Sequence, residues 1–398
     1  MSISRRSFVA SLALAAAARR LPALVTEQPG RVQASFDPWL EIDSAALTHN
    51  ASTIARLTSR QILAVVKNNA YGLGIATAAP LLEQLDVIAG FAVVRPDEAR
   101  ALKAAAVRKP VLLMGPASDE EADWLARRDV RLAAYTRADA DWLIKLARNL
   151  GRPIDVHLYV DTGMHRMGMP VGDVAAWLDT PGLRSAVRIH GAFTELTEDA
   201  DFDREQARRL HSLGDAAHTK GISIGQLHAA SSDAVAKATS DTYLDLVRPG
   251  LALYGGYATA EAMGRAELRP AYRLKARVIR VDELQAGEGV SYHRRFVADK
   301  PKRIATLAIG HVDGYPSGAV NGCEVLIRGA LHPVVGTVSA SHTIVAMDAG
   351  HPVSVGDEAT LVGADHPSLH PNVVAQRSGW SEYNMFMHLN PSLARRVV

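Results

Sequence analysis

Cysteine is nearly absent from this sequence, since Cys323 is the only one among 398 residues. One cysteine excludes an intrachain disulfide, and no nucleophile motif surrounds Cys323, so we expect an inert core thiol. Lysine and arginine form no basic block with interleaved aromatic residues, which argues against a nucleic-acid partner. No apolar run is long enough to span a bilayer, so we expect a soluble mature protein without a membrane segment.

The N-terminus has the pattern of an export signal. The paired residues Arg5 and Arg6 precede the alanine- and leucine-rich run from Phe8 to Ala18, and small residues follow near Ala34. A charged segment, a short apolar segment and small residues in this order are typical of a secretory signal, and paired arginines favour the twin-arginine route. We therefore predict a signal peptide over 1–34 and a periplasmic or otherwise exported protein. A short membrane anchor or an unstructured leader is the alternative.

The chain after the leader alternates strand-like and helix-like segments. Amphipathic helical stretches lie between the apolar runs, for example Pro96–Ala106, Asp119–Arg128, Thr136–Leu150 and Phe202–Lys220, and Ser118 and Thr136 are predicted caps. Eight such alternations are the signature of a (β/α)8 TIM-type barrel of the α/β class, predicted over 35–270. The eight apolar runs are Ile62–Val66, Val87–Val93, Pro110–Met114, Val130–Ala134, Ile154–Val160, Val187–Ala192, Gly225–Ala229 and Leu244–Val247.

The pattern changes after about Pro270. Short apolar runs now follow one another across glycine or proline turns with little helical periodicity between them, as in an all-β domain. We therefore predict a mostly-β C-terminal domain over 271–398. Its strands are expected at Leu274–Val281, Arg303–Ile309, Cys323–Ile327, Pro333–Val338, Thr343–Met347 and Glu358–Leu361.

Lys67 ends the first predicted barrel strand, in the segment Ala64-Val65-Val66-Lys67-Asn68-Asn69-Ala70-Tyr71-Gly72-Leu73-Gly74. Active sites of such barrels lie at the carboxyl ends of the strands. A lysine buried there is costly unless it is neutralised, and a covalent bond to an aldehyde cofactor would remove much of that cost. By position alone, a lysine that extends to solvent is the alternative.

The amino-acid sequence of this segment resembles the signature of the alanine racemase family, enzymes of fold type III that use pyridoxal 5'-phosphate. The resemblance runs from about Trp39 to Arg395 and implies the same barrel and β domain, an amino-acid substrate and this cofactor. The further matching segments, in the order of the family, are Asp161–Gly168, His228–Ser232, Val247–Gly255, Gly289–Tyr292 and Ile309–Tyr315.

The resemblance implies a role for each matched residue in cofactor binding. Lys67 would hold the cofactor covalently, and Arg248, kept in place by His228, would face the pyridine nitrogen and keep it unprotonated. Arg166 would contact the phenolic oxygen of the cofactor and the substrate carboxylate. The phosphate would be bound by Tyr71, Ser232, Tyr383 and the backbone N–H groups of Gly250 and Leu251.

The resemblance also implies two bases on opposite faces of the substrate. Lys67 would serve the D face, and Tyr292 would serve the L face from the β domain of a partner subunit, so that activity requires a homodimer. Ala340 would line the substrate pocket through its backbone N–H. Without the family pattern, Tyr292 would be interpreted as an ordinary core or rim tyrosine.

Several residues depart from the family pattern, mostly on the substrate side. Glu195 stands where a histidine is usual, and a carboxylate beside Tyr292 would disfavour its phenolate. We therefore expect Glu195 to be protonated or turned away, or Tyr292 to act differently. Tyr159 replaces a lysine that orients the arginine at Arg166, and His311 and Leu73 also differ. With the short side chain of Ala340, these changes favour a substrate larger than alanine.

Two other functions remain open on the sequence. One is a different enzyme on the same scaffold, such as an aldolase or dehydratase of D-hydroxy amino acids, which would recruit a metal. The sequence shows no cluster of histidine and cysteine ligands for that, so no metal is predicted. The other is a relative that binds the cofactor without catalysis, against which the β domain and Tyr292 argue.

Overall fold

The structure is a computed structural model, and it describes residues 35–259, 262, 263, 265–348 and 350–398. The predicted signal peptide therefore lies outside the described residues. None of the helices in the described part of the chain is long and apolar enough to cross a membrane.

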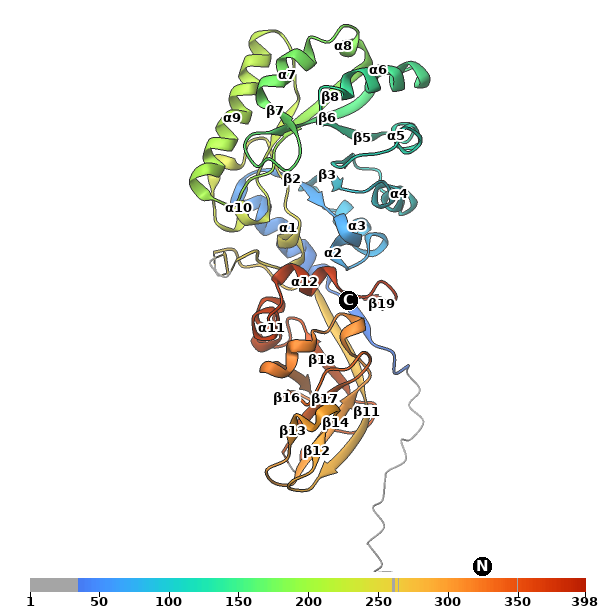
Figure 1. The fold of residues 1–398 in the computed structure, drawn as a ribbon, viewed down its shortest axis with the longest axis vertical. Coiled ribbons are helices and arrows are strands. Elements are labelled where there is room, and N and C mark those ends of the chain that lie inside the picture. The colour runs from blue at the N-terminus through green and yellow to red at the C-terminus, as the bar shows by residue number, and fades with distance from the viewer. Residues whose placement is uncertain (1–34, 260–261, 264, 349) are drawn as a thin grey trace, which may run out of the picture. The chain divides into compact units, whose positions relative to one another are not determined.

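Eight parallel strands form a closed barrel near the start of the described chain (Figure 1). Neighbours in the ring follow the chain order, and β5 closes it by pairing with β6. The two-residue strand β7 (Met169–Pro170) pairs in parallel with the last residues of β6. Every predicted apolar run overlaps one of these strands, so the TIM-type barrel is confirmed. The strands are β2 (Gln61–Val65), β3 (Ile88–Val93), β4 (Val111–Leu113), β5 (Val130–Ala134), β6 (Ile154–Asp161), β8 (Val187–Phe193), β9 (Gln226–His228) and β10 (Leu246–Val247).

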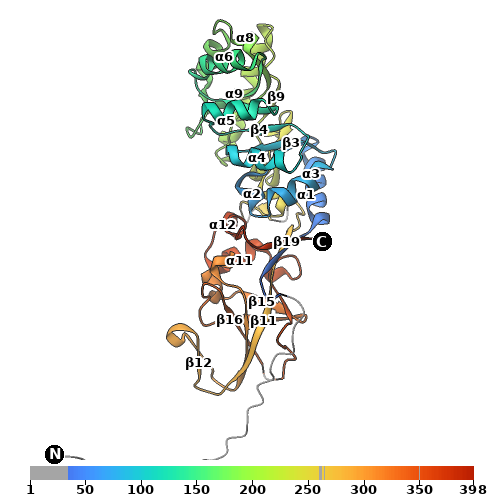
Figure 2. The ribbon, with the colours of Figure 1, turned by 90° about the vertical axis from the view of Figure 1, so that its right-hand side faces the viewer.

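The crossover helices lie outside the ring of strands, as the turned view of Figure 2 shows for α4 and α5. Ser118 caps α5 as predicted, because its hydroxyl accepts a hydrogen bond from the N–H of Glu121. The cap predicted at Thr136 is wrong: α6 begins at Asp139, whose carboxylate accepts the N–H groups of Tyr135 and Thr136. The helices are α1 (Ser44–Thr58), α2 (Lys67–Tyr71), α3 (Ile75–Glu83), α4 (Pro96–Ala104), α5 (Asp119–Ala126), α6 (Asp139–Leu150), α7 (Val171–Leu178), α8 (Leu183–Ala186), α9 (Ala200–Thr219) and α10 (Ser232–Ala236).

A second, mostly antiparallel sheet forms the C-terminal part, which confirms the predicted β domain as a fold. Its strands follow the order β14-β17-β16-β15-β18-β11-β1-β19, and β14 also pairs with β11. A separate two-stranded hairpin, β12 (Gly289–Val290) and β13 (Phe296–Val297), carries Tyr292. The other strands are β1 (Trp39–Ile42), β11 (Tyr272–Leu284), β14 (Lys302–Leu307), β15 (Glu324–Ile327), β16 (Ala330–Val335), β17 (Thr343–Met347), β18 (Glu358–Val362) and β19 (Ala394–Val397).

Both ends of the described chain meet in this sheet. Strand β1, which lies in the range predicted for the barrel domain, pairs antiparallel with β11 and parallel with β19. Two helices that the sequence did not suggest, α11 (Pro371–Ser378) and α12 (Glu382–Met387), lie between β18 and β19. The predicted domain boundary between residues 270 and 271 remains a prediction. Strand β1 precedes this boundary in the sequence but pairs with strands that follow it.

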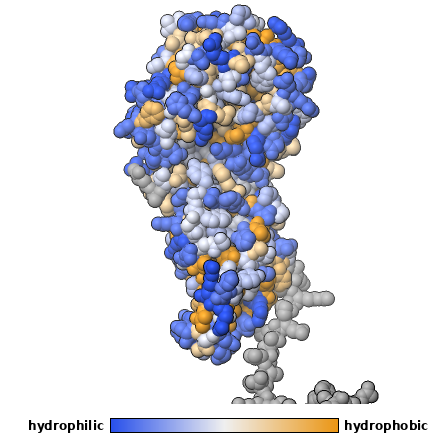
Figure 3. Space-filling model, viewed as in Figure 1, coloured by the Kyte–Doolittle hydropathy of each residue, from blue (hydrophilic) through white to orange (hydrophobic). Residues whose placement is uncertain are grey.

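Hydrophobic burial supports both parts. Trp39, Phe91, Phe193, Tyr272 and Phe386 are among the largest side chains with almost no exposed surface. On the face drawn in Figure 3, the surface is mostly hydrophilic, and hydrophobic residues interrupt it over the C-terminal strands. The single thiol of Cys323 is buried, which raises its pKa to about 11, as expected of an inert core cysteine.

Candidate active site

Lys67 lies at the carboxyl end of the barrel, two residues after the end of strand β2. It is half-buried, and burial is the main reason that its pKa is lowered below the ordinary value of a lysine; Glu195 opposes this shift and Arg166 adds to it. A lowered pKa increases the fraction of neutral amine near pH 7. Only the neutral amine can attack an aldehyde, so the site prepares Lys67 for covalent attachment of a cofactor.

The backbone after Lys67 forms one turn of left-handed helix. Asn68, Asn69, Ala70 and Tyr71 have φ angles between 51° and 55°, a conformation that costs an L-residue about 1–2 kcal/mol. Hydrogen bonds close the turn, since the N–H of Gly72 donates to the carbonyl of Asn68 at 3.0 Å. The turn places the Tyr71 ring in the buried interior instead of on the surface.

Two distant residues hold this turn from outside. The buried carboxylate of Glu98 accepts the N–H of Asn68 at 2.5 Å, and the Arg395 guanidinium donates to the carbonyls of Gly72 and Leu73 at 2.7 and 2.9 Å. Backbone strain of this kind persists only where the surroundings hold it. The sequence analysis missed both residues. A glutamate in the first turn of a helix and an arginine near a C-terminus are common, and the sequence does not show which groups they contact.

Donors gather at a second point of the site. Ser232 Oγ accepts the N–H groups of Gly250 and Ala252 at 2.9 and 3.1 Å, whereas the buried N–H of Leu251 has no hydrogen-bond partner among the described residues. A Cβ at position 250 would lie 2.2 Å from Tyr71 Oη, so only glycine fits there.

The two tyrosines predicted at the phosphate remain protonated donors. Burial raises the pKa of Tyr71 well above its ordinary value, and burial is also the largest cause that raises the pKa of Tyr383 to about 12. Together with the unpaired N–H of Leu251 and the Ser232 hydroxyl, they form the donor set that a phosphate group requires. These residues, predicted one by one, are thus chemically suited to the phosphate of pyridoxal phosphate.

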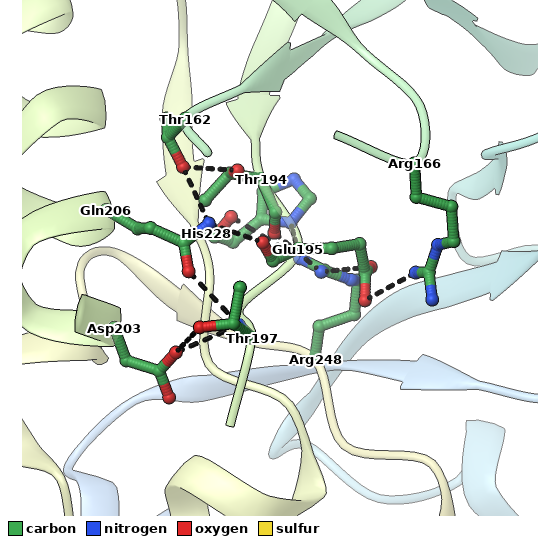
Figure 4. A network of polar contacts seen from close by, with 9 residues as sticks. All are labelled: Thr162, Arg166, Thr194, Glu195, Thr197, Asp203, Gln206, His228 and Arg248. Atoms are coloured by element: carbon green, nitrogen blue, oxygen red, sulfur yellow. Dashed lines mark hydrogen bonds and ion pairs between the residues drawn. The ribbon is translucent and has the colours of Figure 1, made fainter. Parts of the chain in front are cut away.

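Arg248 is buried and held by groups at the ends of two strands, β8 and β9. Its Nη1 donates to His228 Nδ1 at 3.0 Å, and its Nη2 donates to the carbonyl of Thr194 at 2.9 Å and to Glu195 Oε1 at 2.6 Å (Figure 4). Burial, and then the charge of Arg248, lower the pKa of His228 well below its ordinary value, so the imidazole is neutral and can accept. The structure therefore brings together Arg248 and His228, as the sequence predicted.

The contact to His228 continues into the barrel interior. His228 Nε2 lies 3.0 Å from His157 Nδ1, and His157 Nε2 lies 3.3 Å from a guanidinium nitrogen of Arg131. Burial, followed by the nearby Arg131 charge, lowers the pKa of His157 to about 3. Two neutral histidines thus separate two permanent cations, and His157 is a further residue that the sequence analysis did not single out.

Glu195 lies between the two arginines of the site. Its Oε1 contacts Arg248, and its Oε2 lies 3.4 Å from Nη2 of Arg166 (Figure 4). Burial would raise the pKa of Glu195, but Arg248, and after it Lys67, lower the pKa below its ordinary value. The carboxylate is therefore ionised. Of the three alternatives for Glu195, protonation disagrees with the two cations that stabilise the charge, whereas a carboxylate turned away agrees, because within this chain Glu195 is directed at the arginines instead of Tyr292.

The substrate end of the site is more open. The Arg166 side chain is 57% exposed and forms a hydrogen bond with the Tyr159 hydroxyl. Burial raises the pKa of Tyr159, and this hydrogen bond offsets part of that rise. Tyr159 stacks on Phe193 with the ring centroids 4.4 Å apart, so an aromatic ring fills this position. Ala340 is exposed, and its N–H has no hydrogen-bond partner in the part of the chain that the structure describes.

Tyr292 is not joined to Lys67 within one chain. Its side chain is 67% exposed, and no hydrogen bond connects it to any other described residue. Its neighbours Ser291 and His293 have φ angles of 64° and 60°, which is uncommon for residues other than glycine. The predicted pairing of Tyr292 with Lys67 therefore stays a prediction that needs a second subunit. No group of three or more metal-ligating side chains occurs among the described residues.

Solved structures resemble this chain over nearly its whole length. An alanine racemase from Streptomyces lavendulae matches with a TM-score of 0.83 at 25% identity, over 92% of this chain and 98% of that chain. One from Bartonella henselae, described with covalently bound pyridoxal phosphate, matches with a TM-score of 0.77 at 26% identity, over 91% and 99%. The fold and the site thus define an enzyme of the class that joins a TIM-type barrel to a C-terminal β domain.

Sequence comparison identifies the family. The models for the N-terminal and C-terminal domains of alanine racemase match residues 42–258 and 271–397. A curated alanine racemase of Desulfovibrio desulfuricans is 33% identical over 374 residues, which are 92% of this chain and 99% of the relative. The chain belongs to the alanine racemase family. It is a pyridoxal-phosphate-dependent amino-acid racemase, as the resemblance implied.

Proposed function

We propose that this chain interconverts the L and D forms of an amino acid at the site around Lys67. The observation that carries the proposal is the convergence of Lys67, Arg166 and Arg248 on the single carboxylate of Glu195 at one end of the barrel. A neutral amine, a carboxylate-binding arginine and a buried, permanently charged arginine are the groups that α-proton transfer on an amino acid requires.

Each residue has a separate task in this reaction. The cofactor, when bound at Lys67, withdraws electrons from the substrate Cα and so acidifies its hydrogen. The Lys67 amine takes or returns the proton on one face, and Arg166 orients the substrate carboxylate with its fork of N–H donors. Arg248 directs a guanidinium N–H at Nδ1 of His228, which is neutral and accepts it there. Buried donors from Tyr71 and Ser232 would hold the phosphate.

The test of racemisation is an exchange screen in heavy water. Purified protein with pyridoxal phosphate is incubated with each L- and D-amino acid, and deuterium at Cα and the enantiomer ratio are measured. We expect exchange and approach to a racemic mixture for at least one amino acid. Absence of α-hydrogen exchange with every amino acid, although the cofactor is bound, would contradict the proposal and support a cofactor-binding relative without catalysis.

We infer a homodimer in which Tyr292 acts in the site of the partner. What supports this is the exposed Tyr292 ring in a loop whose backbone adopts positive φ angles, carried by a hairpin that is itself anchored in the β domain through Val290 and Phe296. Co-expression of Lys67→Ala with Tyr292→Phe tests it, since each variant alone should be inactive. In mixed dimers one of the two sites keeps both bases, so about a quarter of the wild-type activity should return. No recovery would mean that both bases come from one chain.

We propose alanine or a larger amino acid as the substrate. The exposed Ala340, with its short side chain and free N–H, supports a pocket with room beyond a methyl group. The same exchange screen ranks the substrates by their kcat/KM. We further propose export by the twin-arginine route, which the paired Arg5 and Arg6 support. Periplasmic recovery of a processed protein, and its loss when Arg5 and Arg6 are both replaced by lysine, tests this proposal.

A further inference from the structure

Glu195 is the point where the cofactor side and the substrate side of the site meet. Its two carboxylate oxygens divide between two guanidinium groups, Oε1 at 2.6 Å from Arg248 and Oε2 at 3.4 Å from Arg166 (Figure 4). The three residues come from separate parts of the chain: Glu195 follows β8, Arg166 follows β6 and Arg248 follows β10. No local sequence pattern relates them, and the carboxylate is their common contact.

The two arms of this contact differ in strength. Arg248 is almost fully buried, with 2% of its side chain exposed, and has further acceptors in Thr194 and His228. Arg166 is 57% exposed, and Glu195 is the one acidic group that pairs with it among the described residues. A short contact between buried charges is stronger than a longer one open to water. Glu195 is therefore fixed by Arg248 and in turn limits where Arg166 can lie.

The side chain at position 159, next to Arg166, carries no charge, so the charge that orients Arg166 comes from Glu195. Tyr159, on the adjacent strand end, presents an uncharged hydroxyl to Arg166 and packs its ring on Phe193. A neutral hydroxyl attracts a guanidinium less strongly than a carboxylate does. The charge that orients Arg166 thus comes from position 195. The departures from the family pattern at positions 159 and 195 are then one coupled arrangement.

We propose that Glu195 is a positioning residue that ties Arg166 to Arg248, so that the substrate-carboxylate site keeps a defined place relative to the cofactor site. One oxygen occupies a single Nη of Arg166, and the remaining donors of the guanidinium stay available for a substrate carboxylate. The proposal rests on the roles given to Arg166 and Arg248 under the proposed function. It adds that an ionised carboxylate at position 195 is required for both.

Two substitutions of Glu195 distinguish its contact with Arg248 from its contact with Arg166. Glu195→Gln keeps the shape but loses the charge and turns an amide donor toward one guanidinium. We expect the dissociation constant for pyridoxal phosphate to rise about tenfold, measured by absorbance titration of the cofactor-free protein. The KM for the amino acid should also rise about tenfold. Glu195→Asp keeps the charge on a shorter side chain. It should retain the cofactor affinity within about threefold and raise KM, because the longer contact to Arg166 breaks first.

A matched control removes the same charge from the same loop. Glu198 is exposed and contacts neither arginine with its side chain, so Glu198→Gln should leave the cofactor affinity and KM near the wild-type values. The proposal is overturned if Glu195→Gln binds cofactor and substrate like the wild type, or if Glu198→Gln is equally impaired. If Glu195→Gln does not fold, Glu195→Asp decides: an unchanged KM overturns the proposal. The cofactor titration needs no turnover, so a protein that binds pyridoxal phosphate but racemises nothing still gives an answer.

Discussion

Lys67 and Tyr292, the two proposed bases, both lie beside backbone with positive φ angles, but the two segments are supported differently. The turn after Lys67 is buried and is held by the carboxylate of Glu98 and the guanidinium of Arg395. The hairpin that carries Tyr292 is exposed, and the contact of its Ser291 hydroxyl with the carbonyl of Thr337 is long, at 3.4 Å. The first segment is complete within one chain.

This difference indicates where each half of the site is built. Strained backbone persists where packing and hydrogen bonds over-determine it, and the barrel supplies both around Lys67. The hairpin is anchored through Val290 and Phe296, but its loop residues 292–295 are exposed, which agrees with the proposal that a partner subunit covers them. The following predictions test this contrast between the barrel half and the hairpin half, from the largest expected effect to the smallest.

Replacement of the barrel base should have the largest effect. Lys67→Ala removes both the covalent attachment point and one base, so we expect more than about a 10⁴-fold loss of kcat/KM. The absorbance band of the lysine-bound cofactor should vanish as well. Lys145→Ala, at a lysine with 71% of its side chain exposed, serves as the control. Substantial remaining turnover in Lys67→Ala would place the cofactor elsewhere.

Replacement of the hairpin base should leave the cofactor in place. Tyr292→Phe deletes one exposed hydroxyl without a hydrogen-bond partner among the described residues, so stability and cofactor binding should not change. Turnover should fall by about 10²–10⁴-fold, the usual range for loss of a general acid or base. Tyr243→Phe removes a hydroxyl whose contact to the Val235 carbonyl is long, 3.5 Å, and is the control. Wild-type turnover in Tyr292→Phe would leave this tyrosine as scaffolding.

The buried histidines of the barrel half should make the folded protein sensitive to acid. His157 has a folded pKa of about 3 against an ordinary value near 6.5, so between these values the unfolded chain binds the extra proton. This contribution to stability is complete above about pH 6.5 and is lost as the pH falls toward 3, by about 1.4 kcal/mol per pH unit at most.

Urea unfolding at a series of pH values measures this dependence. His157→Gln should flatten the decline below pH 6.5, whereas His218→Gln, at an exposed histidine of α9, should reproduce the wild-type curve. Equal slopes in His157→Gln and the wild type would mean that other groups cause the acid sensitivity.

The smallest effect is expected in the substrate pocket. Ala340→Met adds a longer side chain beside the proposed pocket, so kcat/KM for a large amino acid should fall about tenfold relative to that for alanine. Both substrates are measured on the same protein preparation, which makes the ratio its own control. An unchanged ratio would remove Ala340 from the pocket and weaken the proposal of a substrate larger than alanine.

Local sequence patterns determined much of this protein. Apolar runs of strand length separated by amphipathic stretches predicted the barrel, and Lys67 was placed at a strand end, because these features depend on residues close in the chain. The cofactor residues were found through motifs in which glycine, serine and tyrosine keep short spacings. The cap at Thr136 failed, since the helix begins at Asp139 and the Thr136 hydroxyl donates to the Asp139 carboxylate instead of accepting a backbone N–H.

The tertiary structure decided what these patterns could not. Glu98 and Arg395 reach the turn after Lys67 from 30 and more than 300 residues away, and Glu195 meets Arg166 and Arg248 from other strand ends. Which partner an ionised side chain takes depends on burial and on the summed charges around it, and both arise only when the strands close into a ring. The sequence by itself determined the barrel and the place of Lys67 at a strand end; the fold decided that Glu195 is ionised and faces two arginines.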